Sequence, residues 1–143
     1  MKIIPVPDDM IARAISFGWF KRIYTGTKFN MLPRMQQLAV LSHERGHCEG
    51  HHTEQRLLCL LFAPWMFFKL CKRQEFQADR YACNHGFGRY LYSFLSSDFD
   101  GGMFQPSHIE RRTAILQYEN DSRVVSVKDY FARLGVTDQG VEK

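Results

Sequence analysis

The first apolar positions of the chain recur at helical spacing. Asp8 stands where a capping residue is expected, and the apolar side chains that would share one side of the helix are Met10, Ile11, Ala14 and Ile15. This pattern predicts a first helix over Asp9–Phe17. The following residues, 18–31, mix aromatic and β-branched side chains around Gly26, a pattern typical of a short hairpin or of two edge strands.

A long helix is predicted next, from Pro33 to about Glu49. Proline suits the first turn of a helix, and Gly50 is suited to end one. Residues 98–107 have the composition of a loop, and further helices are predicted over residues 72–84, 89–97, 108–119 and 127–134.

The longest apolar run of the chain is Leu57–Phe68, LLCLLFAPWMFF, with twelve residues and no charge. A membrane-spanning helix needs about 20 apolar residues, so the run is too short to span. We predict a buried core helix that begins near Thr53 and is kinked at Pro64. A helix that docks on a membrane surface or on a partner is the alternative.

These elements predict a mostly helical α+β domain, with a small sheet or hairpin before the helix over residues 33–49. The 143 residues favour one domain over the whole chain, residues 1–143. Its core is expected over about residues 8–134, with residues 135–143 as a frayed tail.

Composition and charge narrow the class of protein. Apolar residues make up 45% and charged residues 24% of the chain, which is an ordinary globular composition. The net charge of +4 comes from scattered basic residues, so we expect no nucleic-acid partner. The amino terminus lacks the apolar core of a signal peptide, and no two cysteines form a CxxC pair. We therefore expect a soluble, cytoplasmic protein in which Cys48, Cys59, Cys71 and Cys83 are free thiols, with disulfides as the alternative.

The residues with the clearest chemistry are His43, Glu44 and His47, which form an H-E-x-x-H motif. On a helix the two histidines lie one turn apart on the same face, so their imidazoles can bind one metal ion. Glu44 can then take a proton from a metal-bound water, and the resulting hydroxide attacks a carbonyl.

A second motif, EFQADRYA, follows 28 residues after His47 and contains Glu75 and Asp79. Catalytic zinc takes three protein ligands and leaves a fourth position open. Glu75 can supply the third ligand, and Asp79, one helical turn on, can hydrogen-bond a ligand histidine and fix its tautomer.

LSHERGH followed by EFQADRYA resembles the gluzincin zinc peptidases, in particular the family of HtpX and the CAAX prenyl proteases and its compact soluble relatives, the minigluzincins. Gly46 matches the glycine of the family's H-E-x-G-H motif, and ADRYA matches its usual ADRxA. The resemblance covers residues 38–82. It implies a zincin-like fold, zinc ligation by His43, His47 and Glu75, and hydrolysis of peptide bonds.

The family also carries a late H-P-x-x-x-x-R element, which this chain matches only in part, in FQPSHIERRTAIL. Aligned on Pro106, the histidine becomes Gln105 and the arginine Arg111. If the arginine is instead Arg112, then His108 is displaced. A developing oxyanion also needs a hydrogen-bond donor, for which the candidates are His108, Arg112, Tyr81, Tyr90 and Tyr92.

Gly50 also extends the motif to H-E-x-x-H-x-x-G, the opening of the metzincin pattern. That pattern places its third histidine at position 53, which here is Thr53. We expect His51 and His52 to be exposed histidines near the helix end, with ligation by either as the alternative.

The sequence thus predicts a zinc metalloendopeptidase with one Zn²⁺ per chain, acting on a peptide or protein through Glu44 as general base. The hairpin before the site helix is expected to offer an edge strand for an extended peptide. One alternative is a regulatory protease of the ImmA/IrrE type. Another is a binding module with structural zinc, closed by His51, His52 or Cys48. A third is a membrane- or assembly-associated component that uses Leu57–Phe68.

Overall fold

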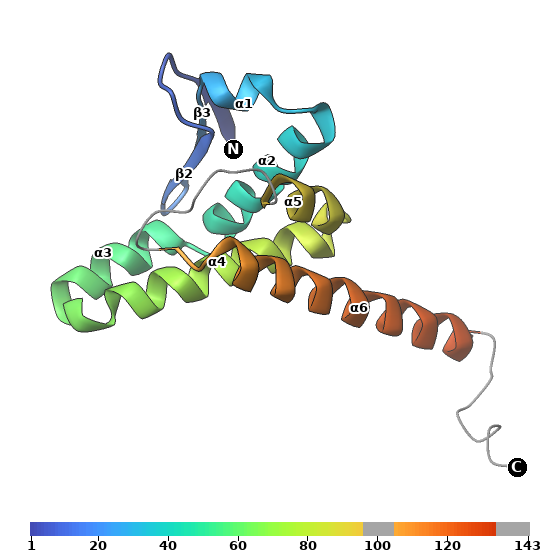
Figure 1. Cartoon of the computed structure of the whole chain (residues 1–143). Coiled ribbons are helices and arrows are strands. Elements are labelled where there is room, and N and C mark those ends of the chain that lie inside the picture. Colours follow the sequence, from blue (N-terminus) through green and yellow to red (C-terminus); the bar gives the residue numbers. More distant parts are fainter. Residues whose placement is uncertain (96–104, 134–143) are drawn as a thin grey trace, which may run out of the picture.

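The computed structural model describes residues 1–95 and 105–133, with side chains for all of these except 122–133. A three-stranded sheet precedes the helices and consists of β1 (Lys2–Pro5), β2 (Ala12–Phe17) and β3 (Phe20–Thr25) (Figure 1). The helices are α1 (Thr27–Met31), α2 (Arg34–Glu49), α3 (His52–Phe62), α4 (Phe67–Asn84), α5 (Gly88–Leu95) and α6 (His108–Arg133), with a 3₁₀ turn, η1 (Pro64–Met66), after α3. The predicted α+β class is confirmed.

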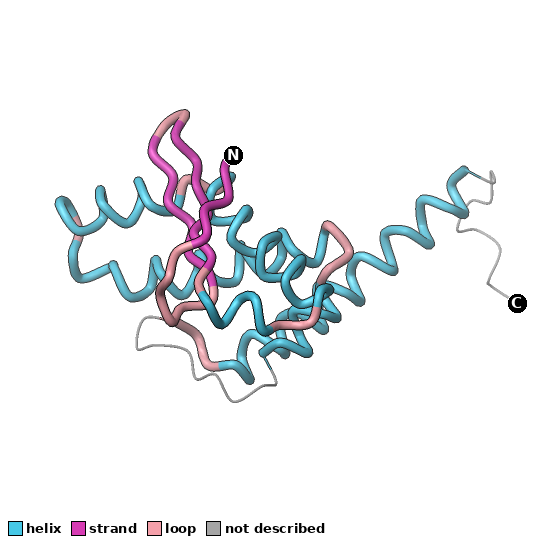
Figure 2. The backbone as a smooth tube through the Cα atoms, turned by 90° about the horizontal axis from the view of Figure 1, so that it is seen from above, coloured by secondary structure: helices cyan, strands magenta, loops and turns pink. Residues whose placement is uncertain are grey.

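The sheet has the order β1-β3-β2, so β2 forms one of its edges. β2 pairs antiparallel with β3, and Ala14 stands opposite Ile23; β1 pairs parallel with β3 on its other side. β2 packs against α2 and α3. The sheet rises beside these helices, while α6 extends away on the other side of the molecule (Figures 1 and 2).

The predicted first helix over Asp9–Phe17 is wrong, because residues 12–17 form β2. The extended conformation lets Ala14 and Ser16 direct backbone N–H groups away from β3, toward side chains of α2 and α3. These tertiary hydrogen bonds override the helical spacing of the apolar residues. The expected hairpin exists, but it turns at Gly18 and Trp19, and Gly26 instead precedes α1.

The helices around the core agree well with the helices predicted from the sequence. α2 ends at Glu49 before Gly50, α4 covers the helix predicted over residues 72–84, and α5 covers the described part, 89–95, of the helix predicted over 89–97. Small side chains allow these helices to pack closely, and the buried core cluster consists of Ala39, Ala82, Cys83, Leu91, Leu95 and Ile115.

The two helices predicted over residues 108–119 and 127–134 are one continuous helix, α6, which ends at Arg133. Of the predicted loop over residues 98–107, the part up to residue 104 lies outside the described residues, as do the predicted tail over residues 135–143 and the end of the helix predicted over 89–97. α6 begins directly after this loop, at His108.

The apolar run Leu57–Phe68 is not one helix kinked at Pro64, because the η1 turn at Pro64 separates α3 from α4, and the run is not buried. α3 ends at Phe62, and most of the large apolar side chains of the run are exposed. The prediction of a buried core helix is therefore wrong. No helix in the described ranges is both long and apolar enough to cross a membrane.

All four cysteines are free thiols, as predicted. Cys48, Cys71 and Cys83 are buried. Burial raises the pKa of Cys48 to about 11 and that of Cys83 to about 12, so these two thiols stay protonated at neutral pH. They behave as packing side chains rather than as nucleophiles.

Candidate metal centre

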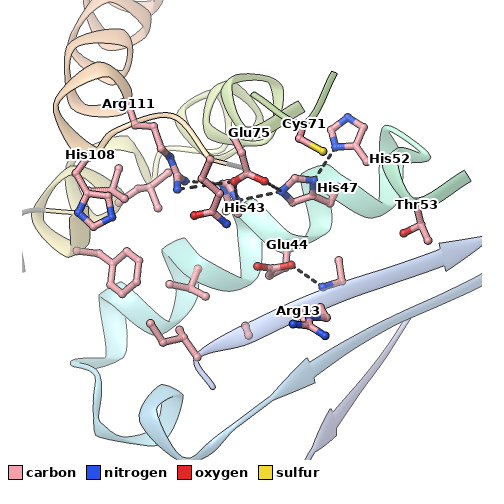
Figure 3. A pocket seen from close by; sticks show the side chains of 18 of the residues that line it. Arg13, His43, Glu44, His47, His52, Thr53, Cys71, Glu75, His108 and Arg111 are labelled. Carbon is pink, nitrogen blue, oxygen red and sulfur yellow. Dashed lines mark hydrogen bonds and ion pairs between the residues drawn. The ribbon is translucent and has the colours of Figure 1, made fainter. Parts of the chain in front are cut away.

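Helices α2 and α4 carry the two predicted motifs and pack against each other at Gly46. A Cβ atom at this position would lie 2.9 Å from the Tyr81 Cβ and 3.0 Å from the Ala78 Cα. Only glycine therefore allows the α4 backbone to come this close to α2. The close approach brings Glu75, on α4, to the face of α2 that carries His43 and His47 (Figure 3).

Three potential metal ligands converge there. The Nε2 atoms of His43 and His47 lie 3.1 Å apart, and each lies 3.4 Å from a carboxylate oxygen of Glu75. Two ligands of one tetrahedral zinc ion, each about 2.0–2.1 Å from it, are separated by about 3.3 Å. In the described part of the chain, His43, His47 and Glu75 are the group whose ligand atoms could hold a metal ion, and their spacing fits zinc.

The charge of Glu75 is balanced from several sides. Its carboxylate is buried and contacts both histidines, and Arg56 Nη2 lies 3.2 Å from its Oε1. Burial alone would raise the pKa of Glu75, but the hydrogen bonds to His43 and His47 outweigh this effect and hold the pKa well below its usual range. Glu75 is thus an ionised carboxylate, the form that binds a metal.

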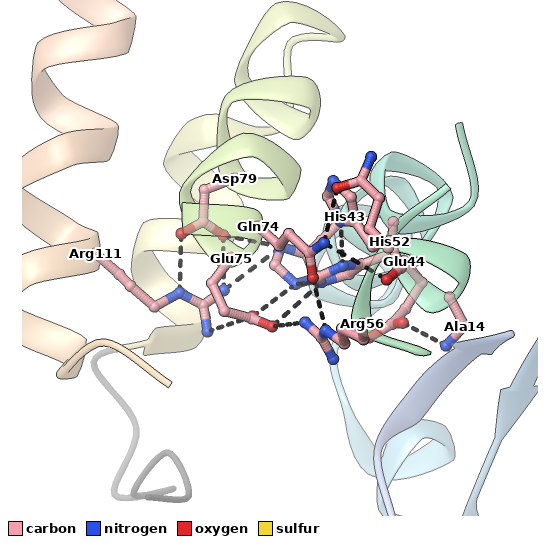
Figure 4. Close-up of polar contacts among 11 residues, drawn as sticks. Ala14, His43, Glu44, His52, Arg56, Gln74, Glu75, Asp79 and Arg111 are labelled. Carbon is pink, nitrogen blue, oxygen red and sulfur yellow. Dashed lines mark hydrogen bonds and ion pairs between the residues drawn. The ribbon is translucent and has the colours of Figure 1, made fainter. Parts of the chain in front are cut away.

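Asp79 fixes the orientation of His43. The Nδ1 atom of His43 lies 2.8 Å from Asp79 Oδ1, and Asp79 is fully buried. Arg111, on α6, donates to both oxygens of Asp79 over 2.8 and 2.6 Å (Figure 4). Burial would raise the pKa of Asp79, but Arg111 and His43 lower it, so the carboxylate stays charged and accepts the Nδ1 proton of His43.

His52 fixes the orientation of His47, as Asp79 does for His43. The two Nδ1 atoms lie 2.7 Å apart, and His52 is only 3% exposed. A turn through Gly50 and His51, whose φ of 53° is left-handed, places His52 there. The expectation that His52 is exposed is therefore wrong, whereas His51 is exposed as expected. When Nε2 of His47 binds a metal, its Nδ1–H donates to His52.

Packing against His52, rather than the metzincin pattern, explains the glycine at position 50. A Cβ atom at position 50 would collide with the imidazole of His52, approaching its Cδ2 within 2.7 Å. The glycine makes room for the buried histidine. Because His52 contacts the Nδ1 atom of His47 and not the Nε2 atom at the metal centre, the geometry gives no support to ligation by His52.

Glu44 is held by the edge strand of the sheet. Its Oε2 accepts a 2.6 Å hydrogen bond from the backbone N–H of Ala14 on β2. Further along the same edge, Thr53 accepts from the N–H of Ser16, and Glu54 from that of Gly18. The expected edge strand is present, but from Ala14 onward side chains already occupy these donors, so they are not available to a peptide.

A cavity of about 470 Å³ opens over the convergent ligands. Glu44 and Arg111 line it together with the three candidate ligands, and residues 11–14 form a wall (Figure 3). His108 and Gln105 also line the cavity, so His108 is still a candidate for contact with a substrate.

Two predicted contacts lie elsewhere. Arg112 donates to the Tyr92 hydroxyl over 2.7 Å, and its guanidinium packs on the Tyr92 ring. Tyr81 stacks on His85 and lines a separate hollow. Arg111 is the arginine that reaches the site, which agrees with the alignment on Pro106. Tyr90, the remaining candidate, accepts a hydrogen bond from Arg89.

Sequence reasoning missed Arg56, His52 and the Ala14 N–H. Both residues follow the first motif within a dozen residues, but the turn at Gly50 and His51 brings His52 to His47, and the packing of α3 against α4 brings Arg56 to Glu75. The chain was also compared with models of known protein families, with characterised proteins and with solved structures, and these comparisons find no significant match.

Proposed function

We propose that this chain is a zinc-dependent metallopeptidase of the gluzincin type, with one Zn²⁺ held by His43, His47 and Glu75. The convergence of these three ligand atoms at 3.1–3.4 Å, in a cavity that also contains Glu44, is the observation that carries the proposal. Both motifs that resemble the HtpX and CAAX prenyl protease family contribute to this arrangement.

The absence of a fourth protein ligand among the nearby described candidates favours a catalytic zinc over a structural one. A structural site closes the fourth position with a further protein ligand. Here the fourth-ligand candidates point elsewhere: His52 to the far nitrogen of His47, Cys48 toward the carbonyl of Arg22, and the exposed His51 to Glu54. The three candidate ligands line the cavity, which would leave room for a water and a substrate carbonyl beside the ion.

A zinc ion held there would supply an acidified water and a Lewis acid for the scissile carbonyl. Glu44 would act as the general base through Oε1, because its Oε2 accepts from the Ala14 N–H. The same carboxylate would then return the proton to the leaving nitrogen. Asp79 and His52 keep the two ligand histidines in the tautomer that presents Nε2. His108 lines the same cavity, which supports a role for it in substrate contact.

The test compares the parent with Glu44→Gln. The amide keeps the shape of the side chain but cannot accept the proton, so we expect one bound zinc and a loss of hydrolysis of about a hundredfold to ten-thousandfold. Zinc is measured by elemental analysis and hydrolysis on unfolded casein. Glu49→Gln, an exposed carboxylate on the same helix, is the matched control and should leave both unchanged.

Two outcomes would contradict the proposal. One is a purified parent chain that binds no transition metal after zinc is supplied. The other is a Glu44→Gln variant that retains full hydrolysis, which would show that another group acts as the base.

A further inference from the structure

The end of the helical hairpin formed by α3 and α4 has an unusual surface. This segment, residues 57–68, is named the hairpin tip. Leu61, Phe62 and Trp65 are exposed by 67%, 75% and 77%. About half of the surface is also exposed for Leu57, Leu58, Leu60, Met66 and Phe68. So many exposed large apolar side chains within one twelve-residue segment are typical of an interaction site.

The hairpin tip lies far from the rest of the fold. In both views it forms the end of the molecule opposite to the carboxyl end of α6, and it projects beyond the sheet (Figures 1 and 2). The buried residues of the hairpin, among them His52 and Glu75, belong to its base, where it meets α2 and the metal centre. No described element of the chain covers the tip.

The segment that contains the hairpin tip carries charged residues of one sign. Residues 55–74 contain four basic residues and no acidic one. Lys69, Lys72 and Arg73 are exposed and follow the tip directly on α4. The surface therefore combines leucine and aromatic side chains with adjacent exposed cations.

We propose that the hairpin tip is a peripheral anchor that inserts into the headgroup region of a bilayer containing anionic phospholipids. Leucine, phenylalanine and tryptophan side chains favour the boundary between headgroups and acyl chains. Lysine and arginine at the same depth attract anionic headgroups, and their long stems can extend along the apolar boundary. Both requirements are met within residues 57–73.

A second copy of this chain fits the hairpin tip less well. In a symmetric dimer the same patch meets itself, so Lys69, Lys72 and Arg73 of one copy would approach those of the other. Like charges brought together in an interface are unfavourable, and residues 55–74 offer no carboxylate to offset them. A bilayer with anionic headgroups meets the same cations with charge of opposite sign.

Anchoring at the hairpin tip would fix the cavity relative to the membrane, because Arg56 and Glu75 belong to the same two helices. A substrate would then be a chain segment at the bilayer surface. The anchor itself is independent of the zinc chemistry, so its test and the test of hydrolysis can fail separately.

The tryptophans of the chain allow a direct test. The chain contains Trp19, in the turn between β2 and β3, and Trp65, in the hairpin tip. Trp19→Phe leaves Trp65 as the reporter, and Trp65→Phe leaves Trp19. With vesicles of equal parts phosphatidylcholine and phosphatidylglycerol, we expect a blue shift of Trp65 emission and co-flotation of the protein, with no shift for Trp19.

Substitutions test the two contributions separately. A basic residue near an anionic surface adds about fivefold to binding, so Lys69→Gln, Lys72→Gln and Arg73→Gln together should weaken it about a hundredfold. Phe62→Ser should weaken it about tenfold or more by removing an inserted ring. Met31→Ser, at a position 80% exposed on α1, is the matched control and should bind like the parent.

Three results would overturn the proposal. The first is absence of binding to the mixed vesicles, and the second is equal binding to pure phosphatidylcholine. The third is a blue shift of Trp65 without lipid that grows with protein concentration, together with a doubled mass in sedimentation, which would assign the surface to a second copy. If the first result is accompanied by binding to an acidic protein, the surface belongs to a protein partner.

Discussion

At the scale of single residues, the two ligand histidines are held by partners of different kinds. His43 donates to the charged Asp79, whereas His47 contacts the neutral ring of His52. Burial and the nearby His47 lower the pKa of His52 to about 4, so it is an uncharged acceptor at neutral pH. His52 therefore orients His47 without adding charge to the centre.

This arrangement predicts the effect of His52→Ala on metal binding. Loss of a group that orients a ligand typically lowers metal affinity by about 10–100-fold, and we expect that range here. Zinc affinity is measured by competition with a chelator. His51→Ala is the matched control, since His51 is exposed and should leave the affinity unchanged. Equal affinities for both variants would show that the contact between His47 and His52 does not hold the ligand.

The same measurement separates ligands from orienting residues. Glu75→Ala should lower zinc affinity more than His52→Ala, because it removes a ligand and a negative charge from the centre. Glu75→Gln keeps the side-chain volume without the charge and should fall between the parent and Glu75→Ala. A chain that loses zinc with His52→Ala but keeps it with Glu75→Ala would contradict the gluzincin arrangement.

Residues of the site were predictable where helical spacing alone decides their geometry. His43 and His47 lie one turn apart on any helix, and so do Glu75 and Asp79. His52 was not predictable, because its burial depends on a left-handed residue at position 51. The choice between Arg111 and Arg112 depends on the register of α6 after a loop, which the sequence leaves open.

At the scale of elements, β2 acts on the site through its backbone. The predicted helix over residues 9–17 would have hidden the Ala14 N–H within its own hydrogen bonds, whereas the strand directs it to Glu44. A backbone donor leaves no signature in the sequence. The sheet is thus more than support for α2, since it holds the proposed general base.

Ala14→Pro removes this donor alone. The Ala14 N–H points away from β3, so proline leaves the ladder of the edge strand intact. A hydrogen bond to a charged group contributes about 1.5–3 kcal/mol, and its loss should lower kcat about tenfold or more with zinc retained. Ile15→Pro, which removes a donor from the ladder itself, should instead destabilise the fold in urea unfolding. Unchanged kcat in Ala14→Pro would show that Glu44 needs no anchor.

Gly46 controls the distance between α2 and α4. Gly46→Ala places a methyl group against the Ala78 Cα, which belongs to the backbone and cannot turn aside. Overpacking of this kind typically costs about 1–3 kcal/mol of unfolding free energy. It should also lower zinc affinity, because Glu75 moves away from the histidines. Arg45→Ala, at an exposed neighbour, is the control for both measurements. A variant with parental stability and affinity would contradict the tight contact.

At the scale of the whole molecule, Asp79 and Arg111 connect three helices at one buried point. Arg111 comes from α6, Asp79 from α4, and Asp79 reaches His43 on α2. A residue of α6 thus helps to set, through Asp79, the orientation of His43 in the motif at residues 43–47. The fold class follows from the sequence, but this connection does not, because it joins side chains 32 residues apart across a loop.

Removing one partner of a buried ion pair typically costs about 3–5 kcal/mol, and we expect Arg111→Met to lower the unfolding free energy by this amount at neutral pH. The loss should depend on pH. The pKa of Asp79 is lowered from 3.8 in the folded protein, so its contribution is complete above that value and is lost as the pH falls through the folded pKa. The difference between parent and Arg111→Met should therefore shrink in acid. Urea unfolding of the metal-free proteins from neutral to acidic pH measures this difference.

The matched control is Arg112→Met, because the Arg112 side chain packs on Tyr92. This variant should show a smaller loss without the pH dependence. If the two arginine variants behave alike, the buried pair does not connect the helices.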